Sequence, residues 1–196
     1  MSIIEEKLPL RAPSPSGWVD AVLGDFDRFL LDHAACERKA SALAMSFVAK
    51  YSDRVKLIEP MISLAREELA HYHEAVKVIL KRGLQLGPDE KDPYVTGLLK
   101  KARNGRDEHF IDRLLVSAVV EARGGERFSI LGRCHPEPEI AKWYRRLGRE
   151  EIAHWKIFHT IATQYFPKDV VEKRLDQFLD YEAEVMLSIP YRPAVH

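Results

Sequence analysis

A duplicated segment constrains the fold of this chain more than any other feature of its sequence. Residues 66–73 read Arg-Glu-Glu-Leu-Ala-His-Tyr-His, and residues 149–156 read Arg-Glu-Glu-Ile-Ala-His-Trp-Lys. The second copy begins 83 residues after the first (149 − 66). At nearly the same offset, a Leu-Leu pair lies seven residues before Glu37 and again before Glu121. Because there are only two copies, the repeat predicts a duplicated helical hairpin and not a solenoid.

Glycine, proline and apolar spacing divide the chain into helices. Four long segments have apolar residues at helical spacing, at about 25–51, 54–82, 107–132 and 139–166. In the second, Pro60 suggests a start near Glu59, since proline is tolerated in a first turn. Shorter helices are expected at about 94–102 and 169–187. Strand-like alternation is nearly absent, so we predict an all-α protein built as an up-down bundle.

Length and composition fit one globular domain. The chain has 196 residues, a size that can bury its own core, so we predict a single domain over 1–196. Residues 1–17 are expected to form an irregular arm, and residues 188–196 an irregular tail. No run of about 18 apolar residues suggests a membrane span, and the start of the chain lacks the apolar core of a signal peptide. With two cysteines and no CxxC pair, we expect a cytoplasmic protein.

Each long helix has one glutamate near the middle of its apolar face, and two of these glutamates are followed at i+3 by a histidine on the same face. A buried carboxylate is tolerated only if it is paired, neutralised or bound to a metal, and no Lys or Arg lies at the matching level of these faces. Four Glu and two His form the ligand set of ferritin-like di-iron and di-manganese proteins. We therefore predict a ferritin-like four-helix bundle with additional short and C-terminal helices and a two-metal site. Its candidate ligands are Glu37, Glu68, His71, Glu121, Glu151 and His154.

Several other residues compete for a role in this site. Glu126 lies close to Glu121 and is the alternative ligand from its helix, although it falls off the apolar stripe. Glu67 and Glu150 precede ligand glutamates and point about 100° away, so we expect them at the surface or behind the ligands. Cys36 is expected to be a small buried filler and Cys134 a loop thiol. The histidines expected to be satisfied or exposed, and not ligands, are His33, His73, His109, His135 and His159.

Four segments resemble the bacterial tRNA-(2-methylthio-isopentenyl-adenosine) hydroxylase family. They are the sequences at 30–40 (Leu-Leu-Asp-His-Ala-Ala-Cys-Glu-Arg-Lys-Ala), 66–73, 121–128 (Glu-Ala-Arg-Gly-Gly-Glu-Arg-Phe) and 149–155. The Glu-x-x-His parts are common to all ferritin-like proteins, whereas the segments around Glu37 and Glu121 are more specific. The similarity extends over nearly the whole chain.

This resemblance implies a non-haem di-iron monooxygenase. Its members hydroxylate the isopentenyl side chain of a hypermodified adenosine next to the tRNA anticodon, using dioxygen and two external electrons. The six candidate ligands would hold two iron ions, with no catalytic residue beyond them and no organic cofactor. The chain has no flavin, nicotinamide or ferredoxin-type motif, so the electrons are expected from a separate reductase. The alternatives are another ferritin-like di-iron oxidase, or a peroxide-scavenging or iron-handling protein.

A local excess of basic residues is compatible with RNA as a partner. Between Lys100 and Arg149 there are twelve Lys or Arg residues against seven acids, although the net charge of the whole chain is zero. Trp143 and Tyr144 lie in the same region, and aromatic side chains stack on the bases of single-stranded loops. Basic surface binds phosphate. The alternative interpretation is an ordinary solvated surface.

Overall fold

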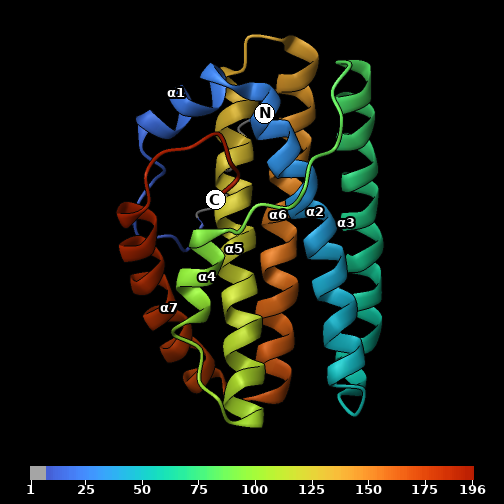
Figure 1. Cartoon of the computed structure of the whole chain (residues 1–196). Coiled ribbons are helices and arrows are strands. Elements are labelled where there is room, and N and C mark those ends of the chain that lie inside the picture. The colour runs from blue at the N-terminus through green and yellow to red at the C-terminus, as the bar shows by residue number, and fades with distance from the viewer. Residues whose placement is uncertain (1–7) are drawn as a thin grey trace, which may run out of the picture. The chain divides into compact units, whose positions relative to one another are not determined.

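The structure is a computed structural model that describes residues 8–196. In this range it contains seven helices and no strand, which confirms the all-α prediction (Figure 1). The helices are α1 (Ser16–Gly24), α2 (Phe26–Lys50), α3 (Val55–Lys81), α4 (Pro93–Leu99), α5 (Arg106–Cys134), α6 (Pro138–Tyr165) and α7 (Lys168–Ser188). None of the helices among these residues is long and apolar enough to cross a membrane.

The contacts within the chain define two compact units. The α2–α3 unit comprises Pro15–Pro93 together with Pro190–His196. The α5–α6 unit comprises the described residues before Pro15 together with Tyr94–Ile189. The prediction of one domain over the whole chain stays a prediction.

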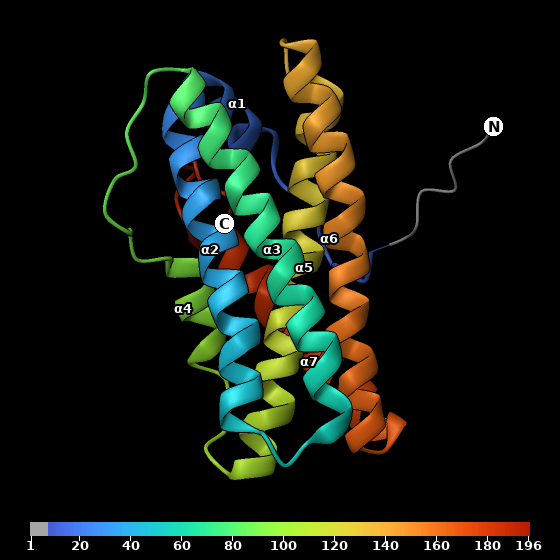
Figure 2. The same cartoon turned by 90° about the vertical axis from the view of Figure 1, so that its right-hand side faces the viewer.

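The α2–α3 unit is an antiparallel helical hairpin with α1 and the last residues of the chain beside it (Figure 2). The Asp25 side chain caps α2 by accepting a hydrogen bond from the Arg28 N–H at 3.2 Å. Gly83, with φ of 75°, follows α3 in the left-handed conformation that glycine adopts without strain. The tail returns to the hairpin, where the Trp18 indole donates to the Ala194 carbonyl at 2.9 Å.

The α5–α6 unit is the second hairpin, with α7 packed on α5 (Figure 1). Two glycines allow its long helices to approach closely. A Cβ placed on Gly148 would lie 2.5 Å from Ser129 Oγ, and one on Gly125 would lie 3.2 Å from the Gly148 carbonyl oxygen. A side chain at Gly148 would also lie 2.9 Å from the Ser129 backbone nitrogen and would force α5 or α6 to shift, whereas one at Gly125 would crowd the same helix contact.

The long helices agree with the predicted segments to within a few residues, and two differences have local causes. The predicted start of α3 near Glu59 is wrong: the helix begins at Val55, because buried Leu57 anchors the first turn and its N–H donates to the Arg54 carbonyl at 2.9 Å.

The second difference lies at the start of the chain. Residues 8–15 are irregular as predicted, but Ser16 and Gly17 belong to α1, which the sequence analysis missed. Its nine residues bury only Trp18 and Val22, so the apolar signal is short. Residues 1–7 of the predicted arm lie outside the described residues. At the other end, Ser188 is helical and the irregular tail starts at Ile189.

Candidate metal centre

The α2–α3 unit brings Glu37, Glu68 and His71 together, and we call these three residues the α2–α3 triad. Each offers a ligand atom, and these atoms lie within 4.8 Å of one another. His71 Nδ1 is 3.6 Å from Glu37 Oε2 and 3.7 Å from Glu68 Oε2. All three side chains are buried, with Glu68 only 1 % exposed. The i and i+3 positions on α3 place Glu68 and His71 on one face, as predicted.

His33 holds the second oxygen of Glu37. Its Nε2 lies 2.7 Å from Glu37 Oε1, one turn earlier on α2, and the ring is fully buried against Phe29. Glu37 thus presents Oε1 to His33 and Oε2 to His71. From the sequence, His33 was predicted to be a satisfied or exposed histidine, and not a residue connected with the site. Its i−4 spacing from Glu37 was the available signal.

The α5–α6 unit brings together Glu121, Glu151 and His154, which we call the α5–α6 triad. Their ligand atoms also lie within 4.8 Å of one another. His154 Nδ1 is 3.3 Å from Glu151 Oε2, and all three residues are buried. The close approach of α5 and α6 at Gly125 and Gly148 positions Glu121 beside the Glu-x-x-His pair of α6. Each half of the sequence repeat therefore forms its own triad.

Glu126 has a different role from the one considered for it in the sequence. Its carboxylate accepts hydrogen bonds from the Ser14 N–H and Ser14 hydroxyl, each at 2.7 Å, and from Arg123 Nη1 at 2.6 Å. These contacts fasten the segment before Pro15 to α5. Glu121, and not Glu126, groups with Glu151 and His154.

The other residues weighed in the sequence lie away from the triads. Glu67 is exposed, and half-buried Glu150 forms an ion pair with Arg146 at 2.7 Å. Neither carboxylate supports a residue of the triads. His159 pairs with Glu172 at 3.0 Å. Cys134 is exposed at the end of helix α5, so the thiol is accessible but not in a loop. Cys36 is only half-buried, which contradicts its prediction as a buried filler.

The geometry of both triads suits a divalent cation. Two donor atoms that bind one ion at about 2.1 Å are separated by about 3.0–3.4 Å. The three nitrogen–oxygen separations within the triads, 3.3, 3.6 and 3.7 Å, are within a few tenths of an ångström of this range. Carboxylates this deeply buried are costly without a positive partner. Mixed carboxylate and imidazole donors are typical of iron and manganese sites.

The basic residues of the α5–α6 unit divide into buried and exposed groups. Arg123 is fully buried and forms a bidentate pair with Glu182, at 2.8 and 3.0 Å. Burial lowers the pKa of Arg127 to about 10, and its guanidinium donates to the Ser14 hydroxyl. Neither arginine is available to phosphate, and Tyr144 is buried too. Of the twelve basic residues between Lys100 and Arg149, eight are exposed: Lys100, Lys101, Arg103, Arg106, Arg133, Lys142, Arg145 and Arg149.

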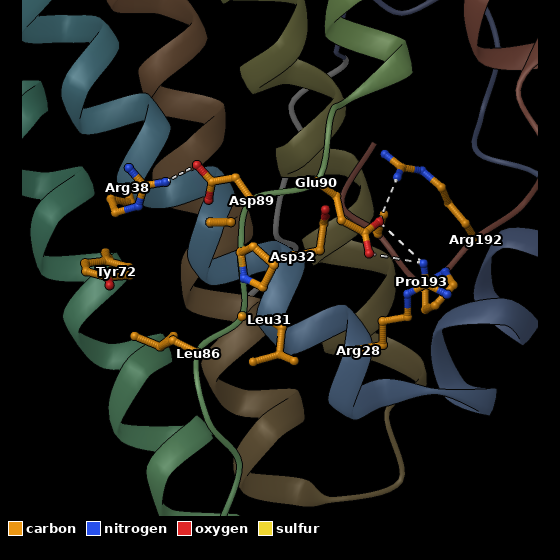
Figure 3. Close-up of a pocket in the computed structure, with 14 residues that line it drawn as sticks. Arg28, Leu31, Asp32, Arg38, Tyr72, Leu86, Asp89, Glu90, Arg192 and Pro193 are labelled. Carbon is orange, nitrogen blue, oxygen red and sulfur yellow. Dashed lines mark hydrogen bonds and ion pairs between the residues drawn. The ribbon is translucent and has the colours of Figure 1, made fainter.

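A pocket of about 530 Å³ opens in the α2–α3 unit, between α2 and the connection that precedes α4 (Figure 3). Three arginines reach its wall, but acids of the connection already pair with them. Arg38 pairs with Asp89, and Arg28 lies 3.3 Å from Glu90. The pocket is therefore lined by neutralised charges, with Tyr72 and Leu86 as its apolar side.

The helices and the two triads define the class of this protein, an all-α carboxylate protein of the ferritin-like kind. A solved chain described as "Protein 43 with aldehyde deformylating oxygenase activity from Synechococcus" matches it with a TM-score of 0.91 and 29 % identity. The match covers 97 % of this chain and 96 % of that one. The predicted fold class is thereby confirmed.

The chain belongs to the tRNA-(MS[2]IO[6]A)-hydroxylase (MiaE) family, whose family model matches residues 2–196. The Pseudomonas putida protein named tRNA 2-(methylsulfanyl)-N(6)-isopentenyladenosine(37) hydroxylase is 36 % identical over 166 residues, which cover 84 % of this chain and 80 % of that protein. The Salmonella typhimurium protein of the same name is 25 % identical, and the match covers 91 % of this chain and 84 % of that protein. The resemblance noted in the sequence is confirmed.

Proposed function

We propose that this chain is a non-haem di-iron monooxygenase that hydroxylates the isopentenyl side chain of a hypermodified adenosine beside the tRNA anticodon. The observation that carries the proposal is the buried triad of two glutamates and one histidine, present in both hairpins of a chain from a tRNA hydroxylase family. The substrate follows the names of the relatives. Dioxygen and two external electrons complete the reaction.

The six triad residues would hold two iron ions. Iron bound by carboxylates and imidazole supplies the activation of dioxygen that amino acid side chains lack. The chain's own share is to orient the donor atoms and to keep them away from water. Burial of Glu68 and Glu151 excludes water from the donor atoms, and His33 fixes which oxygen of Glu37 faces His71. A separate reductase would deliver the electrons.

Exposed basic residues of the α5–α6 unit would contact the tRNA backbone. Phosphate binding requires accessible Lys and Arg side chains, and eight of the twelve between Lys100 and Arg149 are exposed. Such contacts position an RNA without reading its sequence. Because the substrate is a mature tRNA, the proposal includes a cytoplasmic location.

Nucleoside analysis after turnover tests this function. The purified protein is loaded anaerobically with iron and then mixed with dioxygen, a chemical reductant and tRNA that carries the isopentenylated adenosine. The tRNA is digested, and the masses of its nucleosides are measured by mass spectrometry. The wild type is expected to add one oxygen atom. Glu68→Ala is expected to abolish the product, whereas Glu67→Ala, its exposed neighbour on α3, is expected to retain it. No product from iron-loaded wild type would refute the proposed substrate.

A second candidate is another ferritin-like oxygenase activity, favoured by the 29 % identity to the Synechococcus protein with aldehyde deformylating oxygenase activity. A long-chain aldehyde in place of tRNA in the same assay distinguishes the two. Formation of the shortened hydrocarbon, with no tRNA product, would favour this second candidate.

A further inference from the structure

A second group of possible metal ligands lies in the α2–α3 unit and includes a sulfur atom. Cys36 of α2, Asp92 of the connection before α4, and His196 of the tail each offer a ligand atom, all within 4.8 Å of one another. His196 Nδ1 lies 3.4 Å from Asp92 Oδ2. Because consecutive helix residues point about 100° apart, the Cys36 thiol faces away from its neighbour Glu37. The group is therefore separate from the α2–α3 triad.

The tail is held firmly where it contributes His196. The Val195 N–H donates to Asp32 Oδ2 at 2.7 Å, and Arg192 Nη2 donates to the His196 carbonyl oxygen at 3.2 Å. Val195 and His196 are 2 % and 8 % exposed, although this segment has no helix. The backbone of the tail is thus held at α2 by a contact that does not involve Cys36.

Asp92 divides its two oxygens between different partners. Oδ1 faces Arg192 Nη2 at 3.8 Å, whereas Oδ2 faces His196. The guanidinium can therefore remain beside Oδ1 while Oδ2 binds another cation. Asp32 Oδ2 lies 3.7 Å from Cys36 Sγ, so a further carboxylate borders the same position. The thiol therefore has oxygen donors of Asp32 and Asp92 and a nitrogen donor of His196 close to it.

We propose that Cys36, Asp92 and His196 bind a Zn²⁺ ion that fastens the connection and the tail to α2. Thiolate sulfur, imidazole nitrogen and carboxylate oxygen are the three donors that zinc sites use, with water able to complete a tetrahedron. On binding, the Cys36 thiol releases its proton to solvent, and the neutral imidazole and the carboxylate bind through lone pairs. The triads contain no sulfur, so this site differs from them in its preference for thiophilic metals.

Cobalt titration tests the site, because a thiolate bound to Co²⁺ gives a sulfur-to-metal charge-transfer absorption that the oxygen and nitrogen donors of the triads cannot give. The full-length, metal-free protein is titrated with Co²⁺ and then with Zn²⁺. The wild type is expected to show the band, which reaches a plateau as Co²⁺ is added, and Zn²⁺ is expected to remove it. Cys36→Ser is expected to lose the band, and Cys134→Ser, which removes the exposed cysteine of the other unit, is expected to keep it.

Two further variants complete the test. The double variant Glu68→Ala with His71→Ala is expected to keep the band, which separates this site from the proposed iron centre and from the hydroxylase activity. His196→Gln leaves the thiol in place and is expected to lose or greatly weaken the band, as well as the rise in Tm that Zn²⁺ gives the wild type. A folded wild type without the band would overturn the proposal, and so would a band that survives in Cys36→Ser. Either result would mean that Cys36, Asp92 and His196 only hold the tail by hydrogen bonds and ion pairs.

Discussion

Replacing His33 with alanine tests how strongly the histidine beside Glu37 supports metal binding. The ring is fully buried, and its Nε2 lies 2.7 Å from Glu37 Oε1. Alanine removes this hydrogen bond from a buried carboxylate. A hydrogen bond to a charged group contributes about 1.5–3 kcal/mol. At about 1.4 kcal/mol for each factor of ten, this corresponds to about a 10- to 150-fold change in affinity. Mutation of a residue that hydrogen-bonds to a metal ligand typically weakens metal affinity by about 10- to 100-fold, which agrees with this estimate.

The assay is anaerobic Fe²⁺ binding in competition with a chelator of known affinity. His33→Ala is expected to weaken binding by about 10- to 100-fold. His33→Gln, which keeps an N–H donor, is expected to recover part of the loss. The matched control is Ser117→Ala, because Ser117 stands four residues before Glu121 as His33 stands before Glu37. Its hydroxyl donates to the Arg113 carbonyl at 2.9 Å and so turns back to its own helix.

Ser117→Ala is therefore expected to change Fe²⁺ affinity by less than about twofold, which is below 0.5 kcal/mol. Circular dichroism confirms that each variant is folded before titration. If His33→Ala binds iron as tightly as the wild type, or if Ser117→Ala costs as much as His33→Ala, the argument from the hydrogen bond to Glu37 is wrong.

Three predictions concern stability. Glu182→Ala is expected to lower the free energy of unfolding by about 3–5 kcal/mol in urea denaturation, because it leaves the Arg123 cation buried without its bidentate partner. Gly148→Ala is expected to cost about 1–3 kcal/mol by the same measurement, because the new methyl group would lie 2.5 Å from Ser129 Oγ. Burial raises the pKa of Asp112, but hydrogen bonds from two arginines outweigh it and bring the pKa below its usual value of 3.8. The stability from this group is therefore present above pH 3.8 and lost as the pH falls through the folded-state pKa, so wild-type Tm is expected to fall more steeply in acid than that of Asp112→Asn.

Each of these predictions has its own control. Glu184→Ala, at an exposed position on α7, is expected to leave the free energy of unfolding nearly unchanged. A destabilisation as large as that of Glu182→Ala would contradict the argument from the buried Arg123–Glu182 pair. Gly24→Ala meets no atom within 4 Å, so it should not destabilise the protein. A Gly148→Ala variant as stable as the wild type would show that α5 and α6 are not in the close contact described. Parallel Tm profiles of wild type and Asp112→Asn below pH 4 would contradict the pKa argument.

The parts of this protein that the sequence predicted are those set by local periodicity and by the repeat. The long helices followed from apolar spacing, and the grouping of Glu68 with His71 followed from i and i+3 geometry. Duplication then extended the same reasoning to Glu151 and His154. Each of these inferences needs only residues on one helix, so no knowledge of tertiary structure was required.

The parts that were missed depend on residues far apart in the chain. Helix α1 depends on Trp18, whose indole donates to Ala194, a contact that spacing along the sequence cannot reveal. Cys36 was taken as a filler because Asp92 and His196, its neighbours in space, are distant in sequence. Arg123 was counted with the basic surface, although Glu182 of α7 neutralises it in the core.

Iron content and product formation, measured on one preparation, test the central claim most directly. The comparison is between wild type, Glu121→Ala, and Glu126→Gln, which alters the neighbouring glutamate that binds Ser14 and Arg123. We predict two irons per chain and hydroxylated nucleoside for the wild type and Glu126→Gln, and loss of both for Glu121→Ala. A wild-type protein that is folded, binds no iron in either oxidation state and forms no product would contradict the account.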